Sequence, residues 1–370
     1  MKVTIKKDDL LSAVNTVHNI VSQQSTLRIL QNILLETTSK GLLFVANDME
    51  VGAKREVPAE IKEEGTITVS AKKFADAVRE LPADTDIVIE TDGNIIKVDA
   101  GKLKYNLTGL SREDFPEFPT FLPQNTINID AKILKKLISK TAFAVSMDIS
   151  RRILMGIYFQ IKENKIVFVA TDGKRLAYID NEIDTSEIKS PVEIIIPSKA
   201  LTELNKVLTE EGQVKIDIGQ NLVLFEFNST VFIARIIDGQ YPDYTLVIPK
   251  DFKSTLIVDS EDLLKDIKAA SVLSDVKTNS ITFDLKGKKT VLKTEHPELG
   301  SATKVFDAEY QGDSLQIVFN HIFITEIIRA INSEKVKIGL NEPLSPAMFT
   351  PIDESDTSKY ILMPLKVADI

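Results

Sequence analysis

The residues of this chain that could carry chemistry are few and widely spaced. Cysteine is absent, and the three histidines, His18, His296 and His321, lie far apart in the sequence. Disulfides and thiolate metal sites are therefore excluded, and little remains for a histidine-based metal site. The chain also contains no Walker A sequence and no G-x-G-x-x-G dinucleotide fingerprint. We expect no metal ion and no cofactor.

Acidic residues leave one enzymatic alternative open, a nuclease or hydrolase. Asp172 lies in a Thr-Asp-Gly segment that could be catalytic, although a hairpin turn accounts for the same residues. The pair Asp8-Asp9 begins a predicted helix, and the pair Glu63-Glu64 lies in a predicted loop, where carboxylates are stabilised or solvated. The sequence therefore favours a protein that is not an enzyme.

A row of lysines is the clearest chemical pattern. Residues 131–146 read AKILKKLISKTAFAVS and contain no acidic side chain. Lys132, Lys136 and Lys140 recur at intervals of four, so on a helix about 22 Å long they form one stripe opposite an apolar face. Such a stripe suits phosphates and reads no base sequence. It predicts sequence-independent binding to double-stranded DNA, provided that basic residues gather on one face of a chain whose net charge is −9.

The elements that must position this stripe recur three times along the chain. Apolar strands lead into Asn-Asp or Thr-Asp and then into a second strand at residues 42–52 and 166–177, with a weaker copy at 290–297. Each third also shows an alternating strand, a helix, more strands, a second helix and closing strands. The predicted helices are 8–21 and 71–81 in the first repeat, 131–145 and 198–208 in the second, and 260–273 and 320–331 in the third.

These patterns predict an α+β fold of three tandem domains, each with two helices packed on antiparallel sheets. Proline-bearing polar stretches near residues 115–124 and 248–253 separate the repeats. The predicted domains are 1–122, 123–252 and 253–370. The alternative is a three-repeat scaffold without DNA, but such a scaffold would not need the lysine stripe.

The location of the protein is indicated by what the sequence lacks. Residues 1–7 alternate apolar and polar and are followed by no apolar signal-peptide region. No apolar run approaches the roughly 20 residues that a membrane span needs. We expect a cytoplasmic protein with no membrane partner.

Four motifs stand in order on the threefold repeat. They are SREDFPEFP at 111–119, TDGKRL at 171–176, DGQYPDY at 238–244 and YILMPL at 360–365. With them, the whole chain resembles the bacterial DNA sliding clamp, the beta subunit of DNA polymerase III. The resemblance implies a DNA-clamp fold in which two protomers associate head to tail into a closed six-domain ring. It also implies a non-catalytic processivity factor that encircles duplex DNA and tethers the replicative polymerase.

The resemblance further implies a peptide-binding pocket between the second and third repeats. Its occupants would be the polymerase catalytic subunit, the clamp loader, and repair and translesion proteins that carry a short clamp-binding peptide. Lys174 stands where many relatives have histidine, and Leu246 where some have arginine, which implies a different partner preference. The matching positions are Leu154, Thr171, Gly173, Lys174, Arg175, Leu176, Pro242, Leu246, Val247, Ser345, Ile361, Leu362, Met363, Pro364 and Leu365.

Two further sets of residues are expected to contact DNA and a second protomer. The homodimer joint is expected at the edge strand 102–107 and at the end of the helix 260–273. The DNA-facing set is Gln24, Lys73, Arg79, Lys132, Lys136, Lys140, Arg151, Arg152 and Lys199. The dimer set is Lys73, Lys102, Lys104, Tyr105, Val272, Leu273, Glu295 and Glu298.

Overall fold

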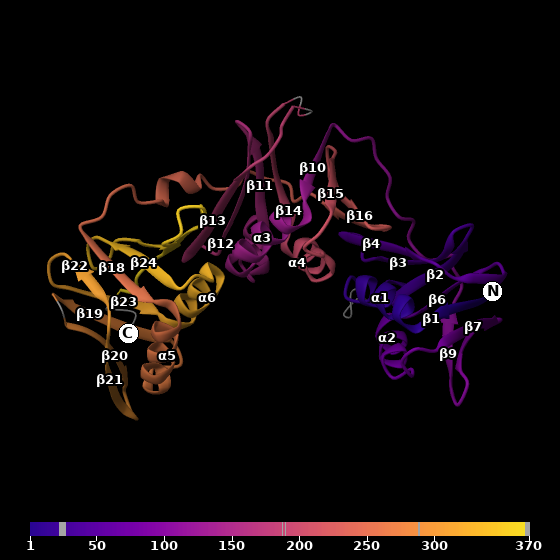
Figure 1. Ribbon diagram of the computed structural model, residues 1–370, viewed down its shortest axis with the longest axis horizontal. Helices are drawn as coiled ribbons and strands as arrows, with labels where there is room; N and C mark the ends of the chain where they lie inside the picture. Colours follow the sequence, from indigo (N-terminus) through magenta and orange to yellow (C-terminus); the bar gives the residue numbers. More distant parts are fainter. Residues whose placement is uncertain (22–26, 187, 189, 288, 367–370) are drawn as a thin grey trace. The chain divides into compact units, whose positions relative to one another are not determined.

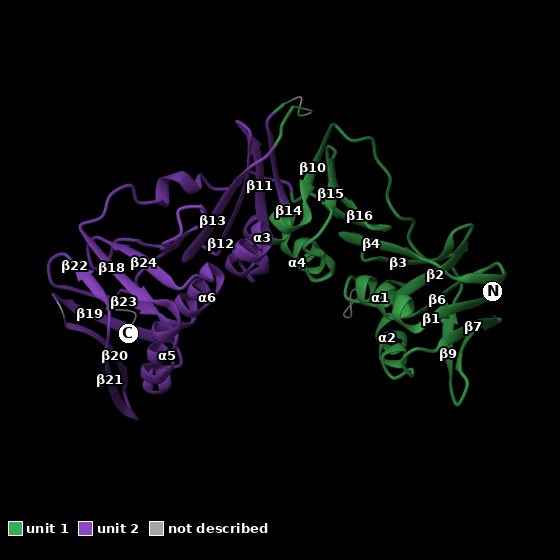
Figure 2. Cartoon of the chain, viewed as in Figure 1, with its two compact units in different colours: residues 1–135, 184–190, 196–237 green, residues 136–183, 191–195, 238–370 purple. Residues whose placement is uncertain are grey.

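The structure is a computed structural model that describes residues 1–21, 27–186, 188, 190–287 and 289–366. It divides into two compact units (Figure 2). Unit 1 comprises residues 1–135, 184–190 and 196–237, and unit 2 comprises residues 136–183, 191–195 and 238–370. In the described residues each predicted repeat contains two α-helices. These are α1 (Lys7–Val17), α2 (Ala71–Arg79), α3 (Ala131–Thr141), α4 (Ser198–Val207), α5 (Ser260–Ala270) and α6 (His321–Ile331).

Unit 1 is built on one long antiparallel sheet (Figure 1). Helices α1 and α2 contact each other, and α1 also packs on strands β3 and β4. The strand order is β10 (Asn125–Asp130), β15 (Gln213–Ile218), β16 (Leu222–Phe227), β17 (Thr230–Arg235), β4 (Val51–Val57), β3 (Gly41–Asn47), β2 (Asn32–Thr38), β6 (Thr66–Ser70), β9 (Leu103–Leu110), β8 (Ile95–Ala100), β7 (Asp86–Asp92), β1 (Lys2–Lys6) and β5 (Glu60–Glu63).

Unit 2 contains two antiparallel sheets, and helices α5 and α6 contact each other beside them. The larger sheet has the order β14 (Val192–Pro197), β11 (Gly156–Lys162), β12 (Lys165–Thr171), β13 (Arg175–Glu182), β26 (Lys359–Leu362), β25 (Ala347–Pro351), β24 (Lys335–Leu340), β18 (Ser254–Asp259) and β22 (Glu309–Gln311). The smaller sheet has the order β21 (Gly300–Phe306), β20 (Lys289–His296), β19 (Ser280–Lys286) and β23 (Leu315–Asn320). Short 3₁₀ helices connect these elements: η1 (Arg28–Gln31), η2 (Ala142–Ala144), η3 (Ile149–Met155), η4 (Tyr244–Val247) and η5 (Ser271–Leu273).

The helices form where the apolar spacing predicts them, but the first helix of each repeat is shorter than predicted. In α3, Leu134, Leu137 and Ile138 are fully buried, as the apolar stripe requires. The helix ends at Thr141 and not at Val145, and residues 142–144 continue as a 3₁₀ turn. The Thr141 hydroxyl donates to the carbonyl of Leu137 at 2.8 Å, a contact that can bend the last turn of a helix. Likewise α1 ends at Val17, and α5 gives way to a 3₁₀ turn after Ala270.

Side-chain caps and turn residues fix several element ends. The Asn320 side chain accepts from the backbone N–H groups of Ile322 and Phe323 at the start of α6. The dipeptide Asp92-Gly93 is a strong sequence signal for a hairpin turn, and a hairpin is present there. Its two-residue turn is Gly93-Asn94, one residue later than this signal predicts, because Asp92 pairs with Ile95. Gly93 has a φ of +56°, a conformation that glycine adopts at no steric cost.

Neighbouring repeats are joined by strand pairing within each unit. In unit 1, β17 of the second repeat pairs with β4 of the first. In unit 2, β13 of the second repeat pairs with β26 of the third. Each joint therefore continues a sheet through backbone hydrogen bonds, and no flexible linker has to hold the repeats together at these strands.

A lysine reinforces each of these joints. Lys199 on α4 forms an ion pair with Asp48, which precedes β4, and donates to the carbonyl of Ile20 at 2.6 Å. Lys140 on α3 lies 2.7 Å from Asp356, which precedes β26, and donates to the carbonyl of Ile331 at the end of α6. In both joints the ammonium group binds a turn aspartate and a carbonyl at or just beyond the end of a helix, where such carbonyls lack intrahelical partners.

Candidate functional site, an apolar pocket beside the Asp172 turn

The turn between β12 and β13 is held by its own side chains. The Asp172 carboxylate accepts from the backbone N–H groups of Lys174 at 2.8 Å and Arg175 at 3.0 Å. The Thr171 hydroxyl accepts from the N–H of Gly173, whose φ is +86°. Asp172 therefore acts as a turn residue, as the hairpin interpretation predicts, and its carboxylate is engaged in structure.

Arg175 is a buried cation directly after this turn. Its side chain is 8% exposed and pairs with Asp172 at 3.2 Å and with Glu326 on α6. It donates to the carbonyl of Phe143 at 2.8 Å, and its guanidinium lies 4.3 Å from the ring centroid of Phe323. A guanidinium with two carboxylate partners, one carbonyl and an aromatic face is fully engaged, so it fixes the wall of the site.

An apolar pocket of about 190 Å³ opens beside this turn, entirely within unit 2. One side is β26, whose Ile361 pairs with Leu176 and whose following residue Met363 donates its N–H to the carbonyl of Lys174. Another side is η4, which starts where the Asp243 side chain accepts from the N–H of Thr245. The lining residues are Leu154, Thr171, Gly173, Lys174, Arg175, Leu176, Pro242, Asp243, Tyr244, Val247, Ile361 and Met363.

The structure brings together ten of the fifteen residues predicted for the peptide pocket. The other five lie outside the lining, and Leu246, 82% exposed, points into solvent. The strand YILMPL serves two purposes: Ile361 and Met363 line the pocket, whereas Leu362 is fully buried in the sheet. The residues outside the lining are Leu246, Ser345, Leu362, Pro364 and Leu365.

Sequence reasoning missed two lining residues, Asp243 and Tyr244. Both belong to the motif DGQYPDY, from which only Pro242 was predicted to line the pocket, so the motif itself was the available signal. Burial raises the pKa of Tyr244, with the nearby Asp243 carboxylate adding to the effect, so its phenol stays neutral. The pocket therefore presents apolar walls, a neutral phenol and two rim charges of opposite sign, Lys174 and Asp243. Walls of this kind are suited to a short apolar segment.

The lysine stripe on α3 is shorter than predicted. Lys132 is exposed, and the half-exposed Lys136 lies 3.7 Å from Asp356. Lys140 is buried, 8% exposed, and its ammonium group is used by Asp356 and the end of α6. The prediction that Lys140 faces DNA is therefore contradicted by its burial. Each step of four residues rotates a side chain by about 40° around an α-helix, so the last lysine of the row points about 80° away from the first.

The other residues predicted to face DNA differ in how far they are engaged within the chain. Lys73 is exposed. Arg79 pairs with Asp76 at 3.2 Å and donates to the ring of His18, and Arg151 lies 3.6 Å from Asp148. Arg152 is exposed, Lys199 is bound by Asp48, and Gln24 lies outside the described residues. Lys73 and Lys132 are therefore the better placed members of the set, because both are exposed and neither forms an ion pair in the described part of the chain.

Comparisons with known proteins agree with this architecture along the whole chain. Sequence profiles of the DNA polymerase III beta subunit match residues 1–119 with its N-terminal domain, 128–243 with its central domain and 245–366 with its C-terminal domain. The chain belongs to this family of sliding clamps. It has three clamp domains and is a non-catalytic processivity factor for DNA polymerase.

Individual clamps are similar over nearly their full length. The beta sliding clamp of Bacillus subtilis is 30% identical over 380 residues, covering 99% of this chain and 100% of that protein. The clamp of Chlamydia muridarum is 28% identical over 369 residues, covering 100% of both. A solved clamp from Bartonella birtlesii, bound to griselimycin, superposes with a TM-score of 0.93 at 30% identity, covering 99% of this chain and 100% of that chain.

In this clamp, the residues predicted for the dimer joint are exposed or half-buried, and Lys104 and Tyr105 lie on a strand with one unpaired side in the described part of the chain. Residues 103–108 of β9 pair only with β8, because β6 reaches only Gly109 and Leu110. Val272 is 78% exposed, Leu273 is half-buried, and Glu295 and Glu298 are exposed. Lys102 is exposed and Tyr105 is half-buried. Lys104 forms an ion pair with Asp99 of its own hairpin at 2.7 Å.

In the described part of the chain, no helix is long and apolar enough to cross a membrane.

Proposed function

We propose that two copies of this chain close head to tail into a ring around duplex DNA. The clamp identity supports this arrangement, and so do the two exposed strand edges. Among the residues that the structure describes, 103–108 of β9 have no partner strand on one side, and β21 is the last strand of its sheet. Unpaired strand edges are completed by another chain or have to be protected. Heterologous contacts that close produce a ring.

The ring holds DNA by topology, and its basic side chains make only loose contacts. Exposed lysines such as Lys73 and Lys132 supply cations to phosphates without reading bases. The chain contains no ATP-binding motif, so a separate clamp loader opens the ring. Replication takes place where the chromosome is, so we place the protein in the cytoplasm.

The pocket beside the Asp172 turn tethers partner proteins to the ring. It is a small apolar site whose lining includes Leu154, Leu176, Val247 and Met363, and its occupants are short apolar peptides. Its partners are the polymerase catalytic subunit, the clamp loader, and repair and translesion proteins with such a peptide. A site of this size binds at about micromolar strength, which permits exchange of partners. The observation that carries this proposal is the convergence of ten predicted residues on one pocket.

Topological binding is tested on nicked circular DNA with a clamp loader and ATP. We expect the protein to stay on circles through high salt and to leave once the circles are cut. Loss from circular and linear DNA at the same salt concentration would show ordinary electrostatic binding and overturn the ring.

Tethering is tested with Met363→Asp, which places a charge in the pocket lining. Met363 is 41% exposed, so the variant should fold, and it should abolish polymerase processivity. Because the clamp loader uses the same pocket, loader-dependent retention on circles should fall as well. The matched control is Ile352→Asp, which is 44% exposed in the same unit and outside the pocket. Equal processivity of both variants would refute this role of the pocket.

A further inference from the structure

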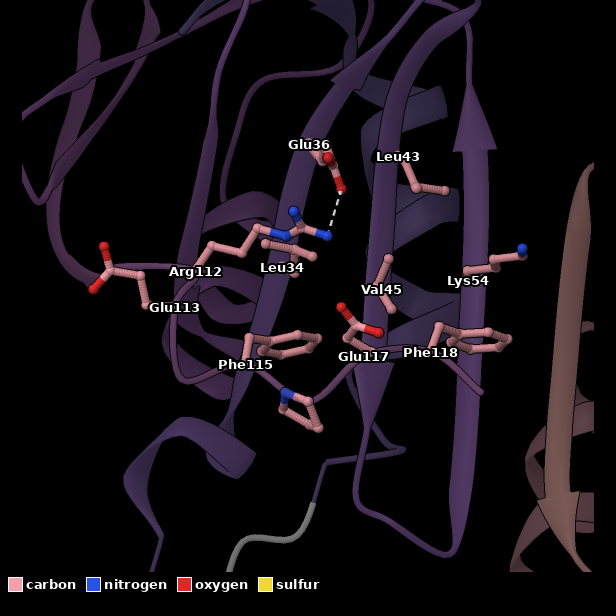
Figure 3. A pocket seen from close by; sticks show the side chains of 11 residues that line it. Leu34, Glu36, Leu43, Val45, Lys54, Arg112, Glu113, Phe115, Glu117 and Phe118 are labelled. Carbon is pink, nitrogen blue, oxygen red and sulfur yellow. Dashed lines mark ion pairs between the residues drawn. The ribbon is translucent and has the colours of Figure 1, made fainter. Parts of the chain in front are cut away.

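A second, larger cavity lies on the sheet of the first repeat (Figure 3). It has a volume of about 580 Å³, and its floor is formed by Leu34, Leu43 and Val45 on β2 and β3. Phe115 and Phe118, from the segment after β9, stand at its side, and Leu34 and Val45 are only 3% and 4% exposed. This volume falls in the range of ligand sites, and none of its lining residues belongs to the pocket beside Asp172.

The second repeat shows what normally fills this space. The two repeats share one strand register, so their residues correspond position by position. Leu34 and Lys54 of the first repeat correspond to Tyr158 and Tyr178 of the second. Val45 and Val169 occupy the same place in the repeated segments 42–52 and 166–177. Val45 pairs with Leu34 on one neighbouring strand and with Lys54 on the other, and Val169 pairs in the same way with Tyr158 and Tyr178.

The closing motifs extend the correspondence. The motifs DFPEF at 114–118 and QYPDY at 240–244 have the same spacing, so Phe115 corresponds to Tyr241 and Phe118 corresponds to Tyr244. The first repeat therefore keeps the two rings of the closing motif and lacks the two rings of the sheet.

In the second repeat the four tyrosines pack against one another. The rings of Tyr158 and Tyr241 are stacked with centroids 5.1 Å apart, and Tyr244 lies 5.9 Å from Tyr158 and 5.8 Å from Tyr178. Aromatic pairs at these separations attract one another beyond their buried area. The cavity of the first repeat is the space from which two of these rings are missing, because leucine and lysine replace them.

Polar groups at the edge of the cavity match a tyrosine hydroxyl. In the second repeat the Tyr244 hydroxyl donates to the Gln160 side chain at 3.4 Å. Phe118 at the position of Tyr244 has no hydroxyl, so the first repeat does not supply this donor itself. The first repeat has Glu36 at the position of Gln160, held near Arg112 at 3.8 Å, and Figure 3 shows this pair at one end of the cavity. A carboxylate accepts a phenolic O–H more strongly than an amide does.

The remaining rim charges indicate what accompanies the ring. Lys54 lies 5.1 Å from the Phe118 ring centroid, where a cation is stabilised by the aromatic face. Glu113 and Glu117 are exposed, and neither has an ion-pair partner within 4 Å in the part of the chain that the structure describes. These two carboxylates favour a basic residue next to the bound ring.

We propose that this cavity binds a tyrosine side chain of a partner protein, on a segment that also carries a lysine or arginine. The occupant restores the ring packing that the second repeat achieves with its own residues. Its hydroxyl donates to Glu36, and its basic neighbour pairs with Glu113 or Glu117. The first clamp domain thereby gains a docking site that differs in chemistry from the pocket beside Asp172.

The test is a titration of the full chain, labelled at leucine and valine methyl groups, with N-acetyl-tyrosinamide. We expect shifts at Leu43 and Val45 that saturate at about millimolar concentration, as for other ligands of this size, with no shift at Val247 of the other pocket. N-acetyl-leucinamide should bind at least several-fold more weakly. Equal binding of the two amides, or no shift at either methyl group, would overturn the proposal.

Two variants connect the binding to the cavity. Leu34→Tyr combined with Lys54→Tyr installs the residues of the second repeat, so it should fold and should remove the response to tyrosinamide. Lys54→Tyr alone, at a half-exposed position, serves if the pair fails to fold. A tyrosine-lysine dipeptide should bind about threefold to tenfold more tightly than a tyrosine-glutamate dipeptide, and Glu113→Gln with Glu117→Gln should remove that difference. Unchanged binding to the filled cavity would refute the site.

Discussion

Replacing Lys140 with methionine tests whether the joint between the second and third repeats depends on a buried ion pair. The side chains of Lys140 and Asp356 are 10% and 13% exposed, and their charged atoms lie 2.7 Å apart. The ammonium group also donates to the carbonyls of Ile331 at 2.9 Å and Ala330 at 3.1 Å. Methionine fills a similar volume without a charge, so the substitution isolates the loss of the cation.

Breaking a buried pair by removing one partner costs about 3–5 kcal/mol, because the other charge stays buried without compensation. Lys136, 3.7 Å from Asp356, keeps a weaker attraction and moves the expected value to the lower end. We therefore expect Lys140→Met to lower the free energy of unfolding of unit 2 by about 3 kcal/mol. Asp356→Asn in the same chain should recover at least half of this loss, because it removes the uncompensated charge.

The pH dependence of this loss follows from the pKa of Asp356. Burial by itself raises that pKa. The hydrogen bond and the positive charge of Lys140, together with the N–H of Ser358, lower it by a larger amount, so the pKa of Asp356 lies below its ordinary value. A carboxyl group with a lowered folded-state pKa stabilises the fold above its unfolded pKa of about 3.9, and this contribution is lost as the pH falls through the folded value. Without Lys140, burial leaves the Asp356 pKa higher in the variant than in wild type. The difference between wild type and Lys140→Met should therefore shrink as the pH falls from the Asp356 pKa of the variant to that of wild type.

Urea denaturation followed by circular dichroism measures the loss, and hydrogen exchange locates it. The chain divides into two units, so a single two-state transition is not assumed. Faster exchange is expected at the end of α6 and in the turn before β26. A variant within about 0.5 kcal/mol of wild type at pH 7, or a loss that does not change with pH, would refute the reasoning.

Three further predictions concern the turn, the DNA contacts and the dimer. Gly173→Ala should lower stability by about 1–2 kcal/mol in thermal unfolding, since its φ of +86° disfavours any side chain; an unchanged Tm would contradict this. Lys132→Ala should reduce the salt dependence of DNA binding by about 0.9 in the log–log slope, whereas Lys140→Met should leave the slope unchanged. Equal slopes for wild type and Lys132→Ala would remove Lys132 from the DNA-facing set. Val272→Asp should shift dimer to monomer in sedimentation, and a dimer of wild-type strength would exclude Val272 from the joint.

The local pattern of this chain was readable because apolar periodicity determines which face of a strand or helix is buried. The helix positions and the Asp172 turn follow from it directly. Helix ends were less accurate, since the Thr141 hydroxyl and the cap of α6 depend on individual hydrogen bonds that no periodicity records. The single-residue displacement of the Gly93-Asn94 turn has the same origin, because strand pairing sets the register.

The candidate site could be predicted from the sequence where a whole wall of the pocket comes from one motif. Residues 171–176 and 361–363 converge on the pocket because β13 and β26 pair. The fate of Lys140 was not readable, because its partner Asp356 lies far along the chain and no helical pattern distinguishes a lysine in solvent from one in a joint. The cavity of the first repeat was also invisible, since it arises from the absence of two rings that only the strand register reveals.

The lysines that reinforce the two joints carry information about ancestry. Lys199 lies on the second helix of the central repeat and reaches the first repeat, whereas Lys140 lies on the first helix of the central repeat and reaches the third. Had a single ancestral repeat already carried this contact, duplication would have copied the lysine onto the same helix each time. The two lysine contacts are therefore not copies of each other, whereas the strand pairing is equivalent at both joints, with β4 pairing with β17 and β13 pairing with β26. In an alignment of the repeats, Lys140 and Lys199 occupy different positions, although each binds a turn aspartate and a carbonyl near a helix end of the neighbouring repeat.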